Sequence, residues 1–284
     1  MTRNERSLLV IGPGYIGLKA AQEALGSGYK VYVLIRNPQK KTEMQALGLV
    51  PVLGDLLKPE TLEDFPLVGN VLISIAPDQH TPDDYRRVYV DGLKAALSRF
   101  SGQEKLLWIS STSVWADSGE DVDEETPAVP LTEQGRILLE AESTLNRRHP
   151  RSMILRLSGI YGPGRNRLQA FRQGIWPDPG SAAALRYLNL IHRDDAVRAI
   201  HFLLDHGQTG QVYLGTDCEP FLNRDLARWL SERLARQTQL PEFEALEPAG
   251  KRCRNRKLKV MGFEYLYPSF REGYGSLLKG ENAP

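Results

Sequence analysis

The feature that most constrains the fold is a glycine-rich turn that joins a short apolar run to a helix-like segment near the start of the chain. Residues 8–11 read LLVI, and a G-x-G-x-x-G pattern follows at 12–17, ahead of a segment rich in Ala, Leu and Lys. In such a strand–turn–helix unit the glycines make the turn, admit a pyrophosphate and let the helix pack on the strand. The helix N-terminus would then face the phosphates. The predicted cofactor-binding residues of this turn are Gly12, Gly14, Tyr15, Ile16 and Gly17.

Strand-like runs alternate with helical patterns through the first half of the chain, which predicts an α/β fold with a doubly wound parallel sheet. We expect a Rossmann domain over 1–160 and a smaller substrate-binding lobe over 161–284, partly woven back into the first domain. An unrelated α/β protein with a similar turn is the alternative. The expected strands are 8–11, 30–35, 50–53, 70–76, 106–110, 153–157 and 211–214, and the expected helices include 82–99, 135–148, 194–205 and 223–237.

Composition limits what the chain can bind. Its 284 residues carry 36 Lys and Arg against 35 Asp and Glu, so no global field favours nucleic acid or an acidic membrane. Cys218 and Cys253 are the only cysteines, which suits a reducing compartment and argues against a disulfide framework or a cysteine-built metal site. No apolar run approaches the roughly 20 residues that span a bilayer, and no signal-peptide pattern surrounds the first strand. We expect a cytoplasmic protein with a small-molecule substrate and without metal, membrane or nucleic acid.

The residues after the second and third expected strands indicate which dinucleotide binds. An acidic residue usually follows the second strand and binds the ribose 2′-hydroxyl of NAD. Arg36 and Asn37 stand there instead, and an arginine can pair with the 2′-phosphate of NADP. We therefore expect a preference for NADP(H), with NAD(H), or an arginine without a role, as the alternatives. Asp55 is placed to bind the adenine amino group or else to cap a helix. Further expected cofactor contacts are Leu56, Ile75 and Ala76.

Four segments, in order, resemble the extended and atypical short-chain dehydrogenase/reductases, the NAD-dependent epimerase/dehydratase family. They are the glycine turn, SSTSVW at 110–115, RLSGIYGPGR at 156–165 and NLIHRDD at 189–195. The last three are similar to the family's SSxSVYG, RxxxxYGPG and IHxDD stretches, and the chain looks most like the subgroup labelled nucleoside-diphosphate-sugar epimerase. The resemblance implies an oxidoreductase or epimerase that acts on a small or nucleotide-linked hydroxylated substrate. It also leaves a homodimer open.

The resemblance implies a Tyr-x-x-x-Lys pair beside a Ser or Thr, in which the lysine lowers the pKa of the tyrosine so that the phenol can transfer a proton. Ser111 matches the hydroxyl position, with Thr112 and Ser113 as alternatives. Alignment with the family's YGxSKxxxE helix puts Gln134 at the tyrosine position and Leu138 at the lysine position. Because a glutamine amide cannot shuttle a proton, the family's usual route is in doubt.

Three functional hypotheses remain, and the third, a nucleic-acid-linked protein, rests on the basic run at 251–259. An enzyme with a relocated acid/base would use Tyr161 or His192, an imidazole that titrates near neutral pH, although a structural role is the alternative for both. A non-catalytic dinucleotide-binding or redox-sensing module is the second hypothesis. The expected catalytic residues are Ser111, Ser113, Tyr161 and His192, and the expected substrate contacts are Gln134, Arg165, Asn189 and Arg193.

Three charged groups are expected to have ordinary structural roles. Asp194 and Asp195 are expected to cap the helix that follows them. Glu140 and Glu142 are expected on the solvated face of their helix. The basic run at 251–259 is expected to be solvated surface, with nucleic-acid binding as the weaker alternative.

Overall fold

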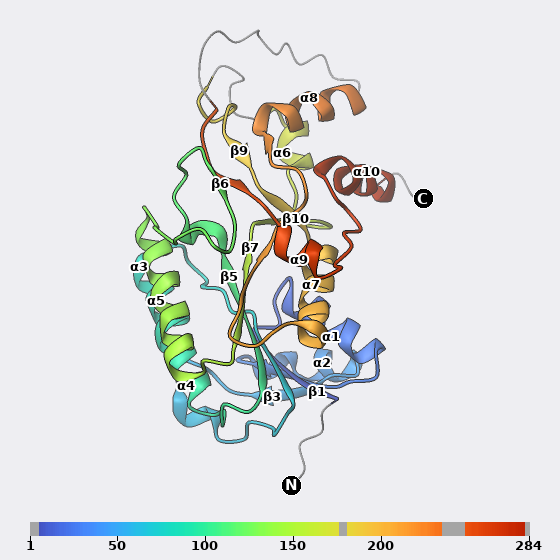
Figure 1. Ribbon diagram of the computed structural model, residues 1–284. Coiled ribbons are helices and arrows are strands. Elements are labelled where there is room, and N and C mark those ends of the chain that lie inside the picture. The colour runs from blue at the N-terminus through green and yellow to red at the C-terminus, as the bar shows by residue number, and fades with distance from the viewer. Residues whose placement is uncertain (1–5, 176–180, 235–247, 282–284) are drawn as a thin grey trace. The chain divides into compact units, whose positions relative to one another are not determined.

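A seven-stranded parallel sheet organises the computed structural model, which describes residues 6–175, 181–234 and 248–281 (Figure 1). The strands lie in the order β11-β7-β5-β4-β1-β2-β3, so the strand order reverses between β1 and β4. In an open α/β sheet a ligand binds at such a reversal, at the carboxyl ends of the strands. The bounds are β1 Ser7–Ile11, β2 Lys30–Ile35, β3 Val50–Leu53, β4 Asn70–Ile73, β5 Lys105–Ser111, β7 Met153–Leu157 and β11 Val212–Gly215.

Helices cover both faces of this sheet, which confirms the predicted doubly wound Rossmann fold. Helices α4 (Leu93–Leu97) and α5 lie on one side, and α1, α2 and α7 lie on the other (Figure 1). A sheet covered on both faces needs strands that are apolar throughout, and β1 is buried at every residue. The helix bounds are α1 Gly17–Gly26, α2 Lys41–Ala46, α5 Glu133–Arg148 and α7 Arg193–His206.

Helix α5 follows its sequence pattern closely. The Thr132 hydroxyl accepts a hydrogen bond from the backbone N–H of Gly135 and caps the first turn. Ile137, Ala141 and Leu145 are buried in the core beneath the sheet. The α5 prediction is therefore confirmed, with a start two residues earlier than expected.

The structure corrects three expected element bounds. Strand β4 ends at Ile73 rather than at residue 76, because the chain turns there to lie against the glycine turn. The helix expected over 82–99 consists of α3 (Pro82–Tyr85), a π-helical segment η3 (Arg86–Gly92) and α4 (Leu93–Leu97). Helix α8 (Asn223–Arg233) ends before residues 235–237, which lie outside the described residues. The shorter 3-10 segments are η1 Pro38–Lys40, η2 Pro59–Leu62 and η4 Thr112–Val114.

The chain divides into two compact units. The first comprises Met1–Val114, Ala128–Arg156 and Val197–Tyr213, and the second comprises Trp115–Pro127, Leu157–Ala196 and Leu214–Pro284. Among its described residues, the second unit contains three two-stranded sheets and a core of its own that includes Tyr161, Phe270 and Tyr274. Its strands are β6 Asp121–Val122, β8 Gly159–Tyr161, β9 Tyr187–Leu188, β10 Leu190–His192, β12 Phe221–Leu222 and β13 Arg252–Cys253. Its other helices are α6 Leu168–Arg172, α9 Arg256–Val260 and α10 Phe270–Glu281.

Candidate functional site

The glycine turn lies at the carboxyl end of β1, where the strand order reverses. Gly12 has a φ of +89°, and a Cβ there would lie 2.5 Å from the carbonyl oxygen of Ser74. A Cβ on Gly17 would overlap the carbonyl oxygen of Gly12. Gly14 differs from both, because it is exposed and a Cβ there would meet no atom within 4 Å. The fold itself therefore requires the first and third glycines, whereas the second leaves backbone open to a ligand. This arrangement fits a dinucleotide pyrophosphate.

Arg36 follows β2, and its side chain pairs with the carboxylate of Asp78, which follows β4. In the sheet, β1 lies between β2 and β4. Nη2 of Arg36 lies 3.3 Å from Oδ1 of Asp78, and the two side chains are 58% and 74% exposed. Asn37 is the N-cap of η1, where its side-chain oxygen accepts a hydrogen bond from the backbone N–H of Gln39. Sequence reasoning missed Asp78, because its proximity to Arg36 depends on the order of the strands.

The other expected cofactor residues surround the same sheet edge. Oδ1 of Asp55 accepts a hydrogen bond from the backbone N–H of Leu57 at 2.9 Å, which is a contact within the local turn. The N-cap of η2 is Lys58, with no side-chain cap, so Asp55 does not cap that helix, and its contact with adenine stays a prediction. Leu56 and Ile75 are half-buried and pack against the core. Ala76 is exposed.

The serine segment (residues 110–113) and the first turn of α5 meet in the first unit. The Ser111 hydroxyl accepts a hydrogen bond from the backbone N–H of Ser113 at 3.2 Å. A Cβ on Gly135 would overlap the carbonyl oxygen of Ser113, so the helix approaches this backbone closely. Nε2 of Gln134 donates to the carbonyl oxygen of His80 at 3.2 Å. Gln134 therefore ties α5 to the loop that follows β4.

Glu142 is not solvated, which corrects the expectation for α5. Its carboxylate accepts hydrogen bonds from Nε and Nη2 of Arg156 at 3.0 and 2.7 Å and from the Ser110 hydroxyl at 2.6 Å. The Glu142 and Arg156 side chains are only 4% and 7% exposed. Glu140 lies on the solvated side and pairs with Arg86. The buried ion pair fixes α5 to β5 and β7 beside the serine segment.

Tyr161 and His192 lie in the second unit, in an aromatic cluster. Tyr161 stacks on Tyr274 with ring centroids 4.9 Å apart, and His192 contacts both Tyr161 and Tyr267 at 5.3 and 4.0 Å. Burial raises the pKa of Tyr161 and lowers that of His192. Nδ1 of His192 accepts a hydrogen bond from the backbone N–H of Asp194. These surroundings favour the structural alternative for both residues over proton transfer at neutral pH.

The three expected substrate contacts of the second unit, Asn189, Arg165 and Arg193, have different surroundings. Oδ1 of Asn189 accepts from the backbone N–H of Cys253, and its Nδ2 donates to the carbonyl oxygen of Lys251. Both ends of the amide therefore bind the backbone beside and within β13, and substrate binding by Asn189 stays a prediction. Arg165 is exposed, and Nε of Arg193 donates to the Asp194 carboxylate.

Asp195 does not cap α7, which corrects a second expectation. Its two carboxylate oxygens accept hydrogen bonds from the backbone N–H groups of Leu266 and Tyr267 at 2.7 and 2.8 Å, and the residue is fully buried. It therefore fixes the segment that leads into α10.

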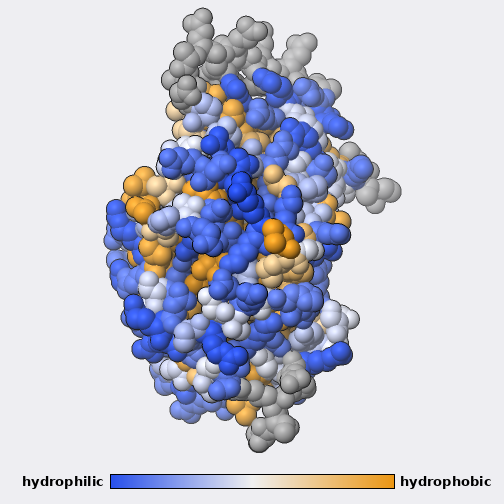
Figure 2. Space-filling view, viewed as in Figure 1, coloured by the Kyte–Doolittle hydropathy of each residue, from blue (hydrophilic) through white to orange (hydrophobic). Residues whose placement is uncertain are grey.

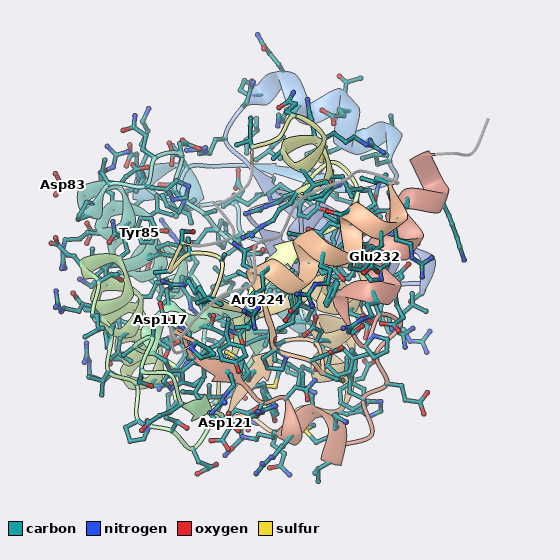
Figure 3. The ribbon with its side chains drawn as sticks, turned by 90° about the horizontal axis from the view of Figure 1, so that it is seen from above. Asp83, Tyr85, Asp117, Asp121, Arg224 and Glu232 are labelled. Carbon is teal, nitrogen blue, oxygen red and sulfur yellow. The ribbon has the colours of Figure 1, made fainter. Side chains whose placement is uncertain are left out.

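The basic run is only partly solvated. Lys251 is buried, donates to the carbonyl oxygen of Trp115 and pairs with Asp117, while Arg252 and Arg254 pair with Asp121. Figure 3 labels both aspartates. These pairings join β13 to β6, which gives the run an internal structural role and further weakens the nucleic-acid alternative.

Asp217 is a buried carboxyl group that sequence reasoning also missed. It is 1% exposed, and its Oδ1 accepts a hydrogen bond from the backbone N–H of Glu219 at 3.3 Å. Burial raises the pKa of Asp217 well above its ordinary value. Above the ordinary carboxyl pKa the unfolded chain loses a proton that the folded chain keeps, so this group lowers stability as pH rises.

We expect Asp217→Asn to be more stable than the wild type at pH 7, because the amide has no proton to lose. Each pH unit between the unfolded and folded pKa values contributes up to about 1.4 kcal/mol. The advantage should fade as pH falls toward about 4, where both states of the wild type are protonated. Urea unfolding between pH 4 and 8 measures this, with the exposed Asp83→Asn as control. An advantage that grows on acidification would contradict it.

The described residues offer no membrane-spanning helix and no metal-binding group. Among the described residues, no helix is both long and apolar enough to span a membrane, and no group of three or more His, Cys, Asp or Glu could hold a metal ion. The face drawn in Figure 2 is mostly hydrophilic, with hydrophobic side chains in small groups.

The chain is similar to proteins of one family. The profile described as the NAD dependent epimerase/dehydratase family matches residues 8–214. Protein YeeZ of Escherichia coli (strain K12) is 27% identical over 279 residues, covering 93% of this chain and 97% of YeeZ. The decarboxylating sterol-4-alpha-carboxylate 3-dehydrogenase of Dictyostelium discoideum is 23% identical over 236 residues, covering 73% and 70%. A solved structure of a candidate NAD-dependent epimerase/dehydratase from Methylobacillus flagellatus is 30% identical, with a TM-score of 0.80 and coverage of 98% and 99%.

Proposed function

The chain belongs to the NAD dependent epimerase/dehydratase family, and on that premise we propose that it binds NADP(H) at the glycine turn. With this cofactor it oxidises, reduces or epimerises a small or nucleotide-linked hydroxylated substrate. The observation that carries the proposal is the open space beside the exposed Gly14, between two glycines that the fold itself requires. The similarity to a protein named as a dehydrogenase supports an enzyme over a non-catalytic module.

The bound dinucleotide would supply the hydride chemistry, and the chain would supply orientation. Gly12, Gly14 and Gly17 would hold the pyrophosphate at the start of α1. The Ser111 oxygen already accepts from the backbone N–H of Ser113, so its own proton is available to donate to a substrate oxygen. We assign Ser111 this binding role.

The acid/base of this proposal is non-standard. The Gln134 amide holds no transferable proton, and it donates to the carbonyl oxygen of His80. Burial argues against Tyr161 in this role, because it raises the pKa of the phenol and makes it a weaker acid. We therefore propose that a group other than Gln134 and Tyr161 carries the proton.

We expect NADPH to bind at least about tenfold more tightly than NADH, because the Arg36 guanidinium can form charge-assisted hydrogen bonds with the 2′-phosphate. Arg36→Gln should weaken NADPH binding by about tenfold or more and leave NADH within about twofold. A fluorescence titration of the purified protein with each cofactor measures both effects.

Arg148→Gln is the matched control, because Arg148 is an exposed residue of the last turn of α5 and should not affect either cofactor. Equal or tighter binding of NADH would overturn the assignment of NADP. Binding of neither cofactor would overturn the proposal as a whole.

A further inference from the structure

We infer that Asp78 is a specificity-determining residue that competes with the 2′-phosphate of NADPH for Arg36. The inference rests on the proposed function, because it takes Arg36 as the ligand of that phosphate. The Asp78 carboxylate pairs with the Arg36 guanidinium, with Oδ1 and Oδ2 both 3.3 Å from Nη2 and Oδ2 3.4 Å from Nη1.

The order of the strands makes this pair a bridge across the cofactor site. Arg36 follows β2 and Asp78 follows β4, while β1 lies between these two strands, with Leu9 paired to Tyr32 on one side and to Val71 on the other. Strands two places apart are separated by roughly 10 Å. The guanidinium and carboxylate therefore meet across the carboxyl end of β1, where the glycine turn begins.

The loop that carries Asp78 is fixed on both sides. Before it, the backbone N–H of Ser74 donates to the carbonyl oxygen of Ile11 at 2.8 Å. After it, the backbone N–H of Gln79 donates to the Asp84 carboxylate at 2.8 Å. Gln134 holds the next residue through the carbonyl oxygen of His80. Because the loop is anchored, Asp78 stays near the site when its partner is taken by another anion.

The charges decide the direction of the effect. Both side chains are largely exposed, so their ion pair is weak and a phosphate with greater charge and three acceptor oxygens can displace the carboxylate. The displaced Asp78 then repels the phosphate at close range. NADH carries an uncharged hydroxyl at this position, so Asp78 neither competes with it nor repels it. Asp78 therefore weakens the binding of NADPH but not that of NADH, and so reduces the preference for NADPH that Arg36 creates.

We expect Asp78→Asn to tighten NADPH binding by about three- to tenfold at low ionic strength and to leave NADH within about twofold. The gain should shrink in high salt, where charge repulsion is screened. Titrations with adenosine 2′,5′-bisphosphate and with 5′-AMP isolate the 2′-phosphate from the rest of the cofactor, and only the bisphosphate should respond. Asp83→Asn is the matched control, because Asp83 is an exposed carboxylate of α3, labelled in Figure 3.

Two further variants separate the possible failures. In Arg36→Gln/Asp78→Asn the gain should disappear, because no guanidinium remains to be released. If Arg36→Gln does not weaken NADPH binding, the proposed function fails together with this inference. If Arg36→Gln weakens it but Asp78→Asn matches the wild type, or tightens NADPH and NADH equally, the inference alone is overturned.

Discussion

Glu142→Ala is expected to lower the free energy of unfolding by about 3–5 kcal/mol, because it removes the buried carboxylate that pairs with the Arg156 guanidinium. Three hydrogen bonds to the carboxylate are lost, two from Arg156 and one from the Ser110 hydroxyl. Water cannot replace them readily, since both charged side chains are less than 10% exposed. Urea unfolding followed by circular dichroism measures the change.

Glu140→Ala provides the control on the same helix. Glu140 pairs with Arg86 at 2.8 Å, but both side chains are exposed, at 41% and 50%, so its loss should cost at most about 1 kcal/mol. Replacing both members of the buried pair, in Glu142→Leu/Arg156→Met, should restore part of the stability, because no unpaired charge remains. If Glu142→Ala and Glu140→Ala lowered the free energy of unfolding equally, the buried pair of Glu142 and Arg156 would not have the stabilising role assigned to it.

The features that could be predicted from the sequence are the local and periodic ones. Residues 8–17 contain a strand, a turn and a helix start in one continuous segment, so the glycine spacing was sufficient to predict the local geometry. The face of α5 that holds Ile137, Ala141 and Leu145 follows from the helical period in the same way.

The features that could not be predicted depend on partners far away in the chain. Glu142 and Lys251 read as surface charges, since nothing near them in the sequence indicates that Arg156 or Asp117 neutralises them in the interior. Asp195 has the spacing of a helix cap, yet it binds backbone N–H groups from a segment about 70 residues further on. Asp78 approaches Arg36 only because β1 lies between β2 and β4.

Gly14→Val is expected to weaken NADPH binding by about 100-fold, or about 2.7 kcal/mol, while the protein stays folded. A Cβ at Gly14 would meet no protein atom within 4 Å, so we expect the substitution to leave the fold intact. The added carbons would instead occupy the space through which the pyrophosphate approaches the backbone. The measurement pairs the fluorescence titration with a thermal unfolding curve for the same variant.

Two other glycines show whether that loss reflects the ligand or the fold. Gly26→Val changes an exposed residue at the end of α1 with equally open surroundings, so it should leave NADPH binding unchanged. Gly17→Ala should lower stability first, because its Cβ would overlap the carbonyl oxygen of Gly12. If Gly14→Val binds NADPH as the wild type does, the pyrophosphate does not cross this turn. The open backbone at Gly14 would then have no part in cofactor binding.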